Sequence, residues 1–257
     1  MTGSGLLQAT EVARETTVQT SANGLRYASF GDTGLDQGEL SRMVQAVPAS
    51  IAAALSGKTY FFVPLAMAEG RNLDGAGHRV AEATMISSAY TTDLAEQAIC
   101  HRNVELSSGE GVFISSRLLN DRFSLAFEFF INVGHGFVNL AGIADAFAEL
   151  AWNQALADVR GETSQDAWES RAAALGRAEG AVRVDERAKT EFLEAAFSDA
   201  IAIYLLSLSL DFDYSELRER EYPLLAPQAL AERLRVVAKL FPPNADYEFA
   251  IRYRRRL

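Results

Sequence analysis

The feature that most constrains the fold is a strongly apolar segment, residues 123–140, with polar side chains along one side. These side chains, here called the polar stripe, follow one another at spacings of four, three and four residues: Glu128, Asn132, His135 and Asn139. At 3.6 residues per turn, such spacings place all four on one face of an α-helix. A helix that is apolar elsewhere is normally buried, and an unpaired buried polar group costs about 1–3 kcal/mol. We therefore expect the polar stripe to be hydrogen-bonded inside the core or to belong to a binding site.

The composition excludes several function classes. The 257 residues are 49% hydrophobic and 23% charged, which is typical of a globular protein. A net charge of −10 argues against nucleic acid as the main partner. No apolar run reaches about 18 residues without polar interruption, so we predict no membrane span. Residues 1–20 lack the basic and apolar regions of a Sec signal peptide. We expect a cytoplasmic protein, or one secreted by a route that needs no signal peptide.

The first half of the chain predicts a short arm, a helix and a small sheet. Residues 1–35 are rich in Thr, Ser and Gly and are predicted to be a loosely ordered arm. Helical periodicity runs from Asp36 to Gly57 with an interruption at Pro48. Strands are predicted at 59–63, 103–106 and 111–115, the last two as a hairpin, with a Gly-rich loop at 69–79.

The second half shows helical periodicity only. Helices are predicted at about 123–140, 144–159, 164–178, 186–209 and 227–240. The predicted fold class is therefore α+β, with a small mixed sheet at 59–115 followed by a helical half at 118–240. Residues 36–257 are predicted to form a single domain.

The helix around residues 191–208 carries an acid on an apolar background. The neighbours of Asp199 one and two turns away are all apolar: Phe192, Ala195, Ala196, Ala202, Ile203 and Leu206. An Asp in such a position is rarely tolerated unless it is paired or bound to a cation. We therefore expect this helix to meet the helix of the polar stripe, with His135 and Asp199 in hydrogen-bond or shared-ligand range.

The order of these elements resembles a known family. An aromatic strand ended by Pro64 precedes the Gly-rich loop, the hairpin, an apolar helix containing Val133-Gly134-His135, and a later helix containing the segment 197–205. This order resembles that of the anthrax lethal factor-like zinc metallopeptidases, which belong to the gluzincin class. The resemblance implies a zincin-like fold. It also implies a His-Glu-x-Gly-His motif on the first helix and an acidic third zinc ligand on the later one.

The motif residues of that family are only partly present. The resemblance places the second histidine on His135 and the third-ligand acid on Asp199. The first histidine falls on Ile131 and the general-base glutamate on Asn132. Isoleucine cannot ligate a metal, and asparagine cannot take a proton from water. The resemblance therefore implies a zinc-peptidase site that has lost both a ligand and its base.

The remaining candidate residues admit several roles. A rearranged metal site would use His135 and Asp199, with Glu128 or His78 as a further ligand. Metal-free acid–base chemistry would use His135 and Asp199, with Glu128 and Asn132 on the same helix face. A hydrogen bond between His135 and Asp199 would instead satisfy both groups in the core without any function. For His101, at the entry to a strand, a functional role is less expected than for His78.

Two functions follow from these alternatives. The first is a pseudopeptidase without a cofactor, which binds a protein or a small ligand in the former active-site cleft. The second is an enzyme that retains a divalent metal or an acid–base pair in the same place. Cys100, the one cysteine, excludes an intrachain disulfide and a Cys-based zinc cluster from both.

Overall fold

The computed structural model describes residues 5–67, 83–119, 121–178, 181–182, 184–213, 217 and 222–251. The chain divides into two compact units, Met1–Phe129 and Phe130–Leu257, here called the N-terminal and the C-terminal unit. The boundary falls inside helix α5 (Arg122–Ala141), which contributes its first turns to the N-terminal unit and the remainder to the C-terminal unit.

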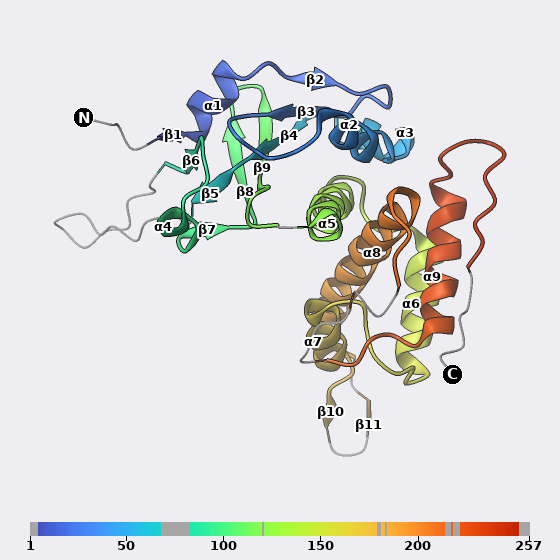
Figure 1. The fold of residues 1–257 in the computed structure, drawn as a ribbon. Coiled ribbons are helices and arrows are strands. Elements are labelled where there is room, and N and C mark those ends of the chain that lie inside the picture. Colours follow the sequence, from blue (N-terminus) through green and yellow to red (C-terminus); the bar gives the residue numbers. More distant parts are fainter. Residues whose placement is uncertain are drawn as a thin grey trace, which may run out of the picture. The chain divides into compact units, whose positions relative to one another are not determined.

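Two sheets form the frame of the N-terminal unit (Figure 1). The five-stranded mixed sheet has the order β2 (Gln19–Thr20), β3 (Arg26–Ser29), β4 (Lys58–Val63), β9 (Gly109–Ser115) and β8 (His101–Leu106). Its three inner strands are parallel and its two outer strands antiparallel. The four-stranded antiparallel sheet has the order β1 (Leu6–Gln8), β6 (Met85–Ser87), β5 (Leu65–Met67) and β7 (Ala98–Ile99).

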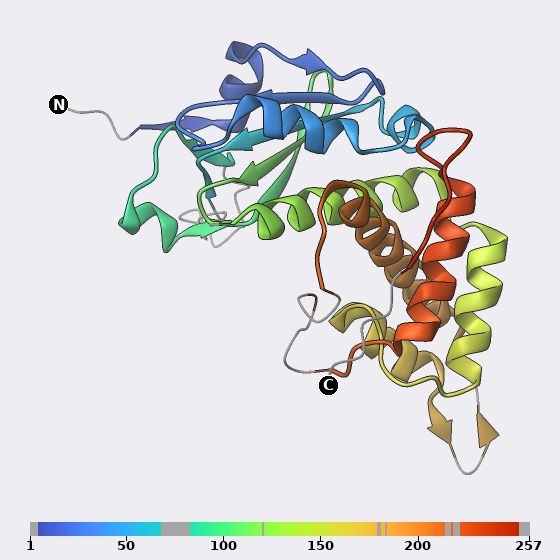
Figure 2. The same cartoon turned by 45° about the vertical axis from the view of Figure 1, so that its right-hand side comes forward.

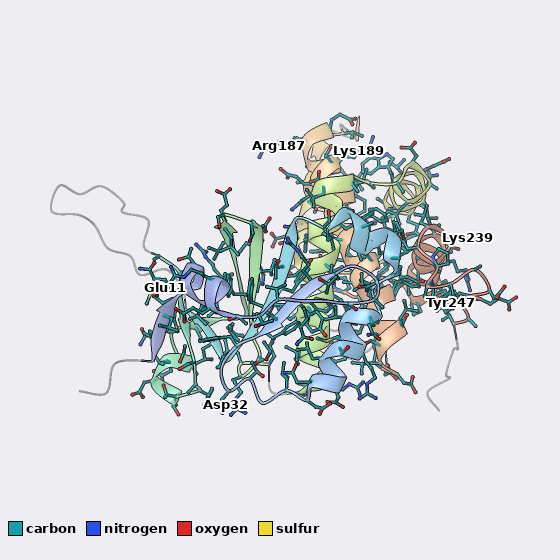
Figure 3. All side chains as sticks on the ribbon, turned by 90° about the horizontal axis from the view of Figure 1, so that it is seen from above. Glu11, Asp32, Arg187, Lys189, Lys239 and Tyr247 are labelled. Carbon is teal, nitrogen blue, oxygen red and sulfur yellow. The ribbon has the colours of Figure 1, made fainter. Side chains whose placement is uncertain are left out.

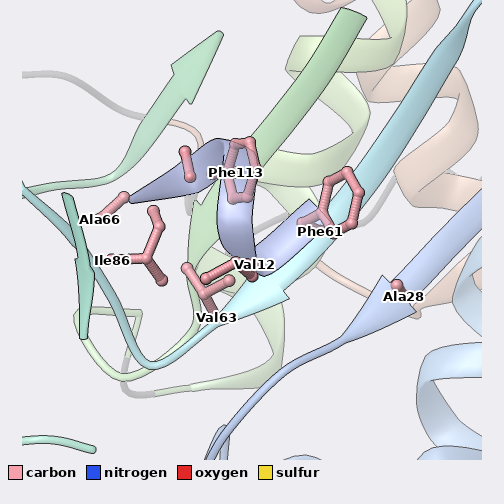
Figure 4. Close-up of a cluster of buried hydrophobic side chains, with 8 residues drawn as sticks. Val12, Ala28, Phe61, Val63, Ala66, Ile86 and Phe113 are labelled. Carbon is pink, nitrogen blue, oxygen red and sulfur yellow. The ribbon is translucent and has the colours of Figure 1, made fainter. Parts of the chain in front are cut away.

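Strand β4 is the central strand of the mixed sheet. All six of its residues are buried, as expected for an aromatic and β-branched run with paired strands on both sides. The chain passes from β4 through Pro64 directly into β5, so one segment joins the two sheets. Between them lies a hydrophobic cluster in which the Phe61 and Phe113 rings stack at 4.7 Å (Figure 4). Its other members are Ala9, Val12, Ala28, Val63, Ala66 and Ile86.

Short helices complete the N-terminal unit: α1 (Ala9–Glu15), α2 (Gln37–Gln45), α3 (Ala49–Ala54) and α4 (Thr92–Ala95). The carboxylate of Asp36 accepts a hydrogen bond from the Glu39 backbone N–H at 2.9 Å, which caps the start of α2. Pro48 separates α2 from α3, so the predicted interruption of this helix is confirmed.

The C-terminal unit is a bundle of helices around α8 (Figures 1 and 2). With the remainder of α5 it contains α6 (Asp145–Leu156), α7 (Gln165–Ala174), α8 (Glu186–Ser209) and α9 (Pro227–Leu240). Helix α8 packs against α6, α7 and α9, and its large side chains Phe192, Phe197 and Tyr204 are fully buried. A short hairpin, β10 (Arg177–Ala178) and β11 (Ala181–Val182), follows α7.

Helix α8 is the one helix in the described part of the chain that is long and apolar enough to cross a membrane by length and composition. Of its most apolar window, 78% is buried inside the protein, which is the pattern of a core helix.

The α+β class, the three predicted strands and the five predicted helices are confirmed. The prediction of a loosely ordered arm is wrong for residues 6–29. These residues contain β1, α1, β2 and β3, and Val12, Leu25 and Ala28 are fully buried. These elements are too short to show a period. The helix predicted at 164–178 ends at Ala174, where the hairpin takes over. The loop predicted at 69–79 lies outside the described residues. A single domain over 36–257 stays a prediction.

Candidate functional site

The polar stripe passes from the protein interior to its surface along α5. Glu128 is half-buried and Asn132 is only 8% exposed, whereas His135 and Asn139 are exposed. The expectation of a buried helix face is therefore wrong for the last two turns. Leu140 beside them is 59% exposed, so the end of α5 presents both polar and apolar side chains to solvent.

Glu128 has a partner within the N-terminal unit. Its Oε1 lies 2.5 Å from Nδ1 of His101, the first residue of β8. Partial burial and the negative charge of Glu128 raise the pKa of the adjacent Cys100 thiol. A thiol with a raised pKa is protonated at neutral pH and is a poor nucleophile. The structure thus joins Glu128 to the histidine that the sequence favoured least, a pairing between distant segments that no local pattern indicates.

Helices α5 and α8 approach each other closely at Gly134 and Ser198, which are next to His135 and Asp199 in the sequence. A Cβ atom added to Gly134 would lie 2.5 Å from the Ser198 carbonyl oxygen, so this position requires glycine. The predicted meeting of the two helices is confirmed at this point. Direct contact between His135 and Asp199 stays a prediction.

Asp199 lies deep in the C-terminal unit at 4% exposure. The Thr163 hydroxyl donates a hydrogen bond to its Oδ2 at 2.8 Å, and the Ser164 hydroxyl is a second hydrogen-bond partner. Burial raises the pKa of Asp199 to about 6, although both hydrogen bonds and the nearby Arg233 act in the opposite direction. Because Asp199 already has partners, its burial alone does not require a contact with His135.

Next to Asp199 lies a network of buried charged side chains, here called the buried ion network: Glu162, Arg171 and Arg233. The Arg233 guanidinium donates to both carboxylate oxygens of Glu162, at 2.8 and 3.2 Å, and both side chains are fully buried. Arg171 donates to Glu162 Oε1 at 3.1 Å and to the carbonyl oxygen of Val159 at 2.7 Å. Its side chain is 6% exposed.

Gln154 connects α6 to this network. Its amide oxygen accepts a hydrogen bond from Arg233 Nε at 2.8 Å, and its amide nitrogen donates to the Ala229 carbonyl oxygen at 3.1 Å. The network therefore ties α6, α7 and α9 together through polar contacts. The network also acts on Asp199, though less than burial does: the charge of Arg233 lowers the pKa of Asp199 and that of Glu162 raises it.

Sequence reasoning missed the buried ion network, although a pattern for it was present. Arg233 lies on the apolar face of α9, with the buried residues Ala229, Leu230 and Val237 one turn away. This is the same pattern that identified Asp199 on α8. A charged residue on the apolar face of a helix indicates a buried partner, and Arg233 satisfies that criterion as clearly as Asp199.

The candidates are thus distributed over separate environments. Asp199 belongs to the core of the C-terminal unit, Glu128 pairs with His101 in the N-terminal unit, and His135 is exposed. His78 lies outside the described residues. Within the described ranges, no three His, Cys, Asp or Glu side chains are grouped as a metal site would need.

Comparison with known proteins adds no family to these observations. The sequence matches no protein-family model, and a search of curated proteins gives no match.

Proposed function

We propose that this chain is a pseudopeptidase: a lethal factor-like zincin fold that has lost the zinc-peptidase motif and acts by binding a protein or a small ligand. The observation that carries the proposal is the environment of Asp199. The acid at the position of the third zinc ligand is buried, hydrogen-bonded to Thr163 and Ser164, and next to the buried ion network. An acid with these partners contributes to the core of the helical unit and needs no metal to balance it.

The residues of α5 support the same proposal. Ile131 and Asn132 occupy the positions of the first zinc ligand and of the general base. Replacing a base by an amide removes its ability to accept a proton from water, which typically costs about 10²–10⁴ in rate. The elements that carry the resemblance (β4, the β8–β9 hairpin, α5 and α8) occur in the expected order.

The binding surface in this proposal is the exposed end of α5. Asn139 supplies hydrogen-bonding groups there, and Leu140 supplies apolar area. Surfaces that combine these side chains suit proteins and small polar ligands. The net charge of −10 disfavours nucleic acid. The proposed setting is the cytoplasm, or secretion by a route that needs no signal peptide.

One observation favours a second candidate, an enzyme with an acid–base or metal site. A carboxyl with a pKa of about 6 is close to the value that suits a general acid or base near neutral pH. In this alternative Asp199 would exchange protons with His135. The 4% exposure of Asp199 restricts access of a substrate, so we place this candidate second.

Peptide cleavage by the unmodified protein tests the proposal. Protein purified without chelator is assayed against a peptide library with and without a metal chelator, and its metal content is measured by elemental analysis. The proposal predicts no chelator-sensitive cleavage and substoichiometric zinc. Chelator-sensitive cleavage would show that a metal site exists and would refute the proposal. If the protein instead catalyses an acid–base reaction other than peptide cleavage, and the substitution Asp199→Asn abolishes it, the second candidate is supported.

A further inference from the structure

The chain after α9, residues 241–251, is here called the C-terminal tail. It makes a hydrogen-bonded turn from Asn244 to Tyr247 and runs back along the C-terminal unit (Figures 1 and 2). Burial alternates along its end: Tyr247, Phe249 and Ile251 are half-buried, whereas the residues between them are exposed. Burial that alternates from one residue to the next is expected of an extended peptide that lies with one of its sides against a surface.

The tail rests on aromatic side chains of α5 and α8, here called the aromatic seat: Phe137, Phe197 and Tyr204. The Tyr204 ring lies 5.7 Å from the Phe249 ring and 6.5 Å from the Tyr247 ring, both edge-on. Figure 3 labels Tyr247 among the side chains of this region. Such aromatic pairs contribute about 0.5–1.5 kcal/mol each beyond their buried area.

The first residue of the tail is held at the same seat. The Phe241 ring packs edge-on against Phe137 at 5.1 Å and lies 6.4 Å from Phe197. The Tyr204 hydroxyl donates a hydrogen bond to the Phe241 carbonyl oxygen at 2.8 Å. The seat therefore contacts the tail at both of its ends.

Backbone hydrogen bonds contribute little to this docking. The backbone N–H groups of Asp246 and Tyr247 donate to the Asn244 side-chain and backbone oxygens, so these bonds stay within the tail. In the described part of the chain, one backbone hydrogen bond joins the tail to a helix: the Phe241 N–H donates to the Val237 carbonyl oxygen of α9 at 2.9 Å. From residue 242 onward the described contacts with the helices are made by side chains, as in a bound peptide rather than a sheet strand.

We propose that the aromatic seat is a peptide-binding surface that the C-terminal tail occupies in cis as a detachable ligand. The ligand class is an extended peptide with aromatic side chains two residues apart. A short tether gives the tail an effective concentration of about a millimolar, so the tail excludes weaker competitors. This inference does not depend on the proposed function.

The test begins with the full, folded chain. A recognition site for a specific protease is inserted between Leu240, which is exposed, and Phe241, the first residue of the tail, and the tail is cut after folding. The proposal predicts that the cut tail stays bound at high protein concentration and dissociates on dilution. A fluorescent peptide of residues 241–251 then binds the cut, washed protein at least about tenfold more tightly than the uncut protein, where the tethered tail competes.

Variant peptides identify the contacts. The peptide with Tyr247→Ala and Phe249→Ala should bind at least about tenfold more weakly, because truncated aromatic anchors commonly cost that much. The matched control, Glu248→Gln at an exposed position, should bind within about twofold of the original. Unfolding on cutting would show that the tail is an integral part of the core and would overturn the proposal. Equal affinity of the cut and uncut proteins, or no binding to either, would also overturn it.

Discussion

The Arg233 guanidinium and the Glu162 carboxylate form a two-point ion pair with both side chains at 0% exposure. The pair joins α9 to the connection between α6 and α7, and Arg171 supplies a second cation to the same carboxylate. Removing one member of such a pair leaves an uncompensated buried charge, which is far more costly than breaking a surface pair. This relationship makes Glu162 a position at which substitution should be strongly destabilising.

Replacing Glu162 by Gln should destabilise the protein strongly. The substitution leaves Arg233 and Arg171 buried without their carboxylate, and we expect the free energy of unfolding to fall by about 3–5 kcal/mol. Chemical denaturation measures this change. The control is Glu191→Gln, which removes the exposed pair with Arg187 and should cost less than about 1 kcal/mol. Equal effects of the two substitutions would contradict the description of the buried ion network.

Asp199 should make stability depend on pH. Burial raises its pKa to about 6 in the folded state, against about 3.9 in the unfolded chain. The folded state therefore holds the proton more tightly, so the contribution of Asp199 is fully present below about pH 4 and is lost as the pH rises through about 6. The Asn variant lacks this titration.

The free energy of unfolding of the unmodified protein, minus that of Asp199→Asn, should thus fall by about 2–3 kcal/mol between pH 4 and pH 7. Urea denaturation over this range measures the difference. A difference that stays constant, or that rises with pH, would show that the pKa of Asp199 is not raised.

A double-mutant cycle tests the predicted contact between His135 and Asp199. If the two side chains interact, the effects of His135→Ala and Asp199→Asn on stability should differ from additivity by at least about 0.5 kcal/mol at pH 7.5. The control cycle pairs Asp199→Asn with Asn139→Ala, one turn further along α5 and exposed, and should be additive. Additivity in both cycles would show that His135 and Asp199 do not interact.

Gly134→Ala should separate α5 from α8. The added methyl group would lie 2.5 Å from the Ser198 carbonyl oxygen, and overpacking of this kind typically costs about 1–3 kcal/mol. The control is Gly57→Ala, where an added Cβ meets nothing within 4 Å. Thermal unfolding distinguishes them: a midpoint lowered in both variants, or in neither, would refute the close approach.

The sequence predicted the elements whose period is long enough to read. Helices α5, α8 and α9 and strands β4, β8 and β9 lie where hydrophobic periodicity placed them. Strands β1, β6 and β7 were missed because they have only two or three residues each, too few to show alternation. Their pairing depends on contacts between distant segments, which one sequence does not reveal.

The candidate site was predictable only where a local pattern in the sequence marked a residue. Asp199 was identified by its apolar neighbours and is buried as expected. Its partner Thr163 lies in a connection without periodicity, so no local pattern pointed to it. Glu128 and His101 are joined across the N-terminal unit, which again requires the fold. His135 was expected to be buried but is exposed, although Phe137 and Val138 beyond it are buried; which side of the last turns of α5 is covered depends on the fold.

Zinc binding by the double variant Ile131→His with Asn132→Glu tests the central claim most directly. The variant restores the two missing residues of the motif, and titration calorimetry measures its zinc stoichiometry, with circular dichroism to verify folding. The matched control adds His135→Ala to the same double variant. A lost zinc-peptidase site predicts about one zinc per chain in the double variant, and no tight binding in the control or in the unmodified protein. A folded double variant that binds no more zinc than the unmodified protein would show that Ile131 and Asn132 do not stand in a former zinc site.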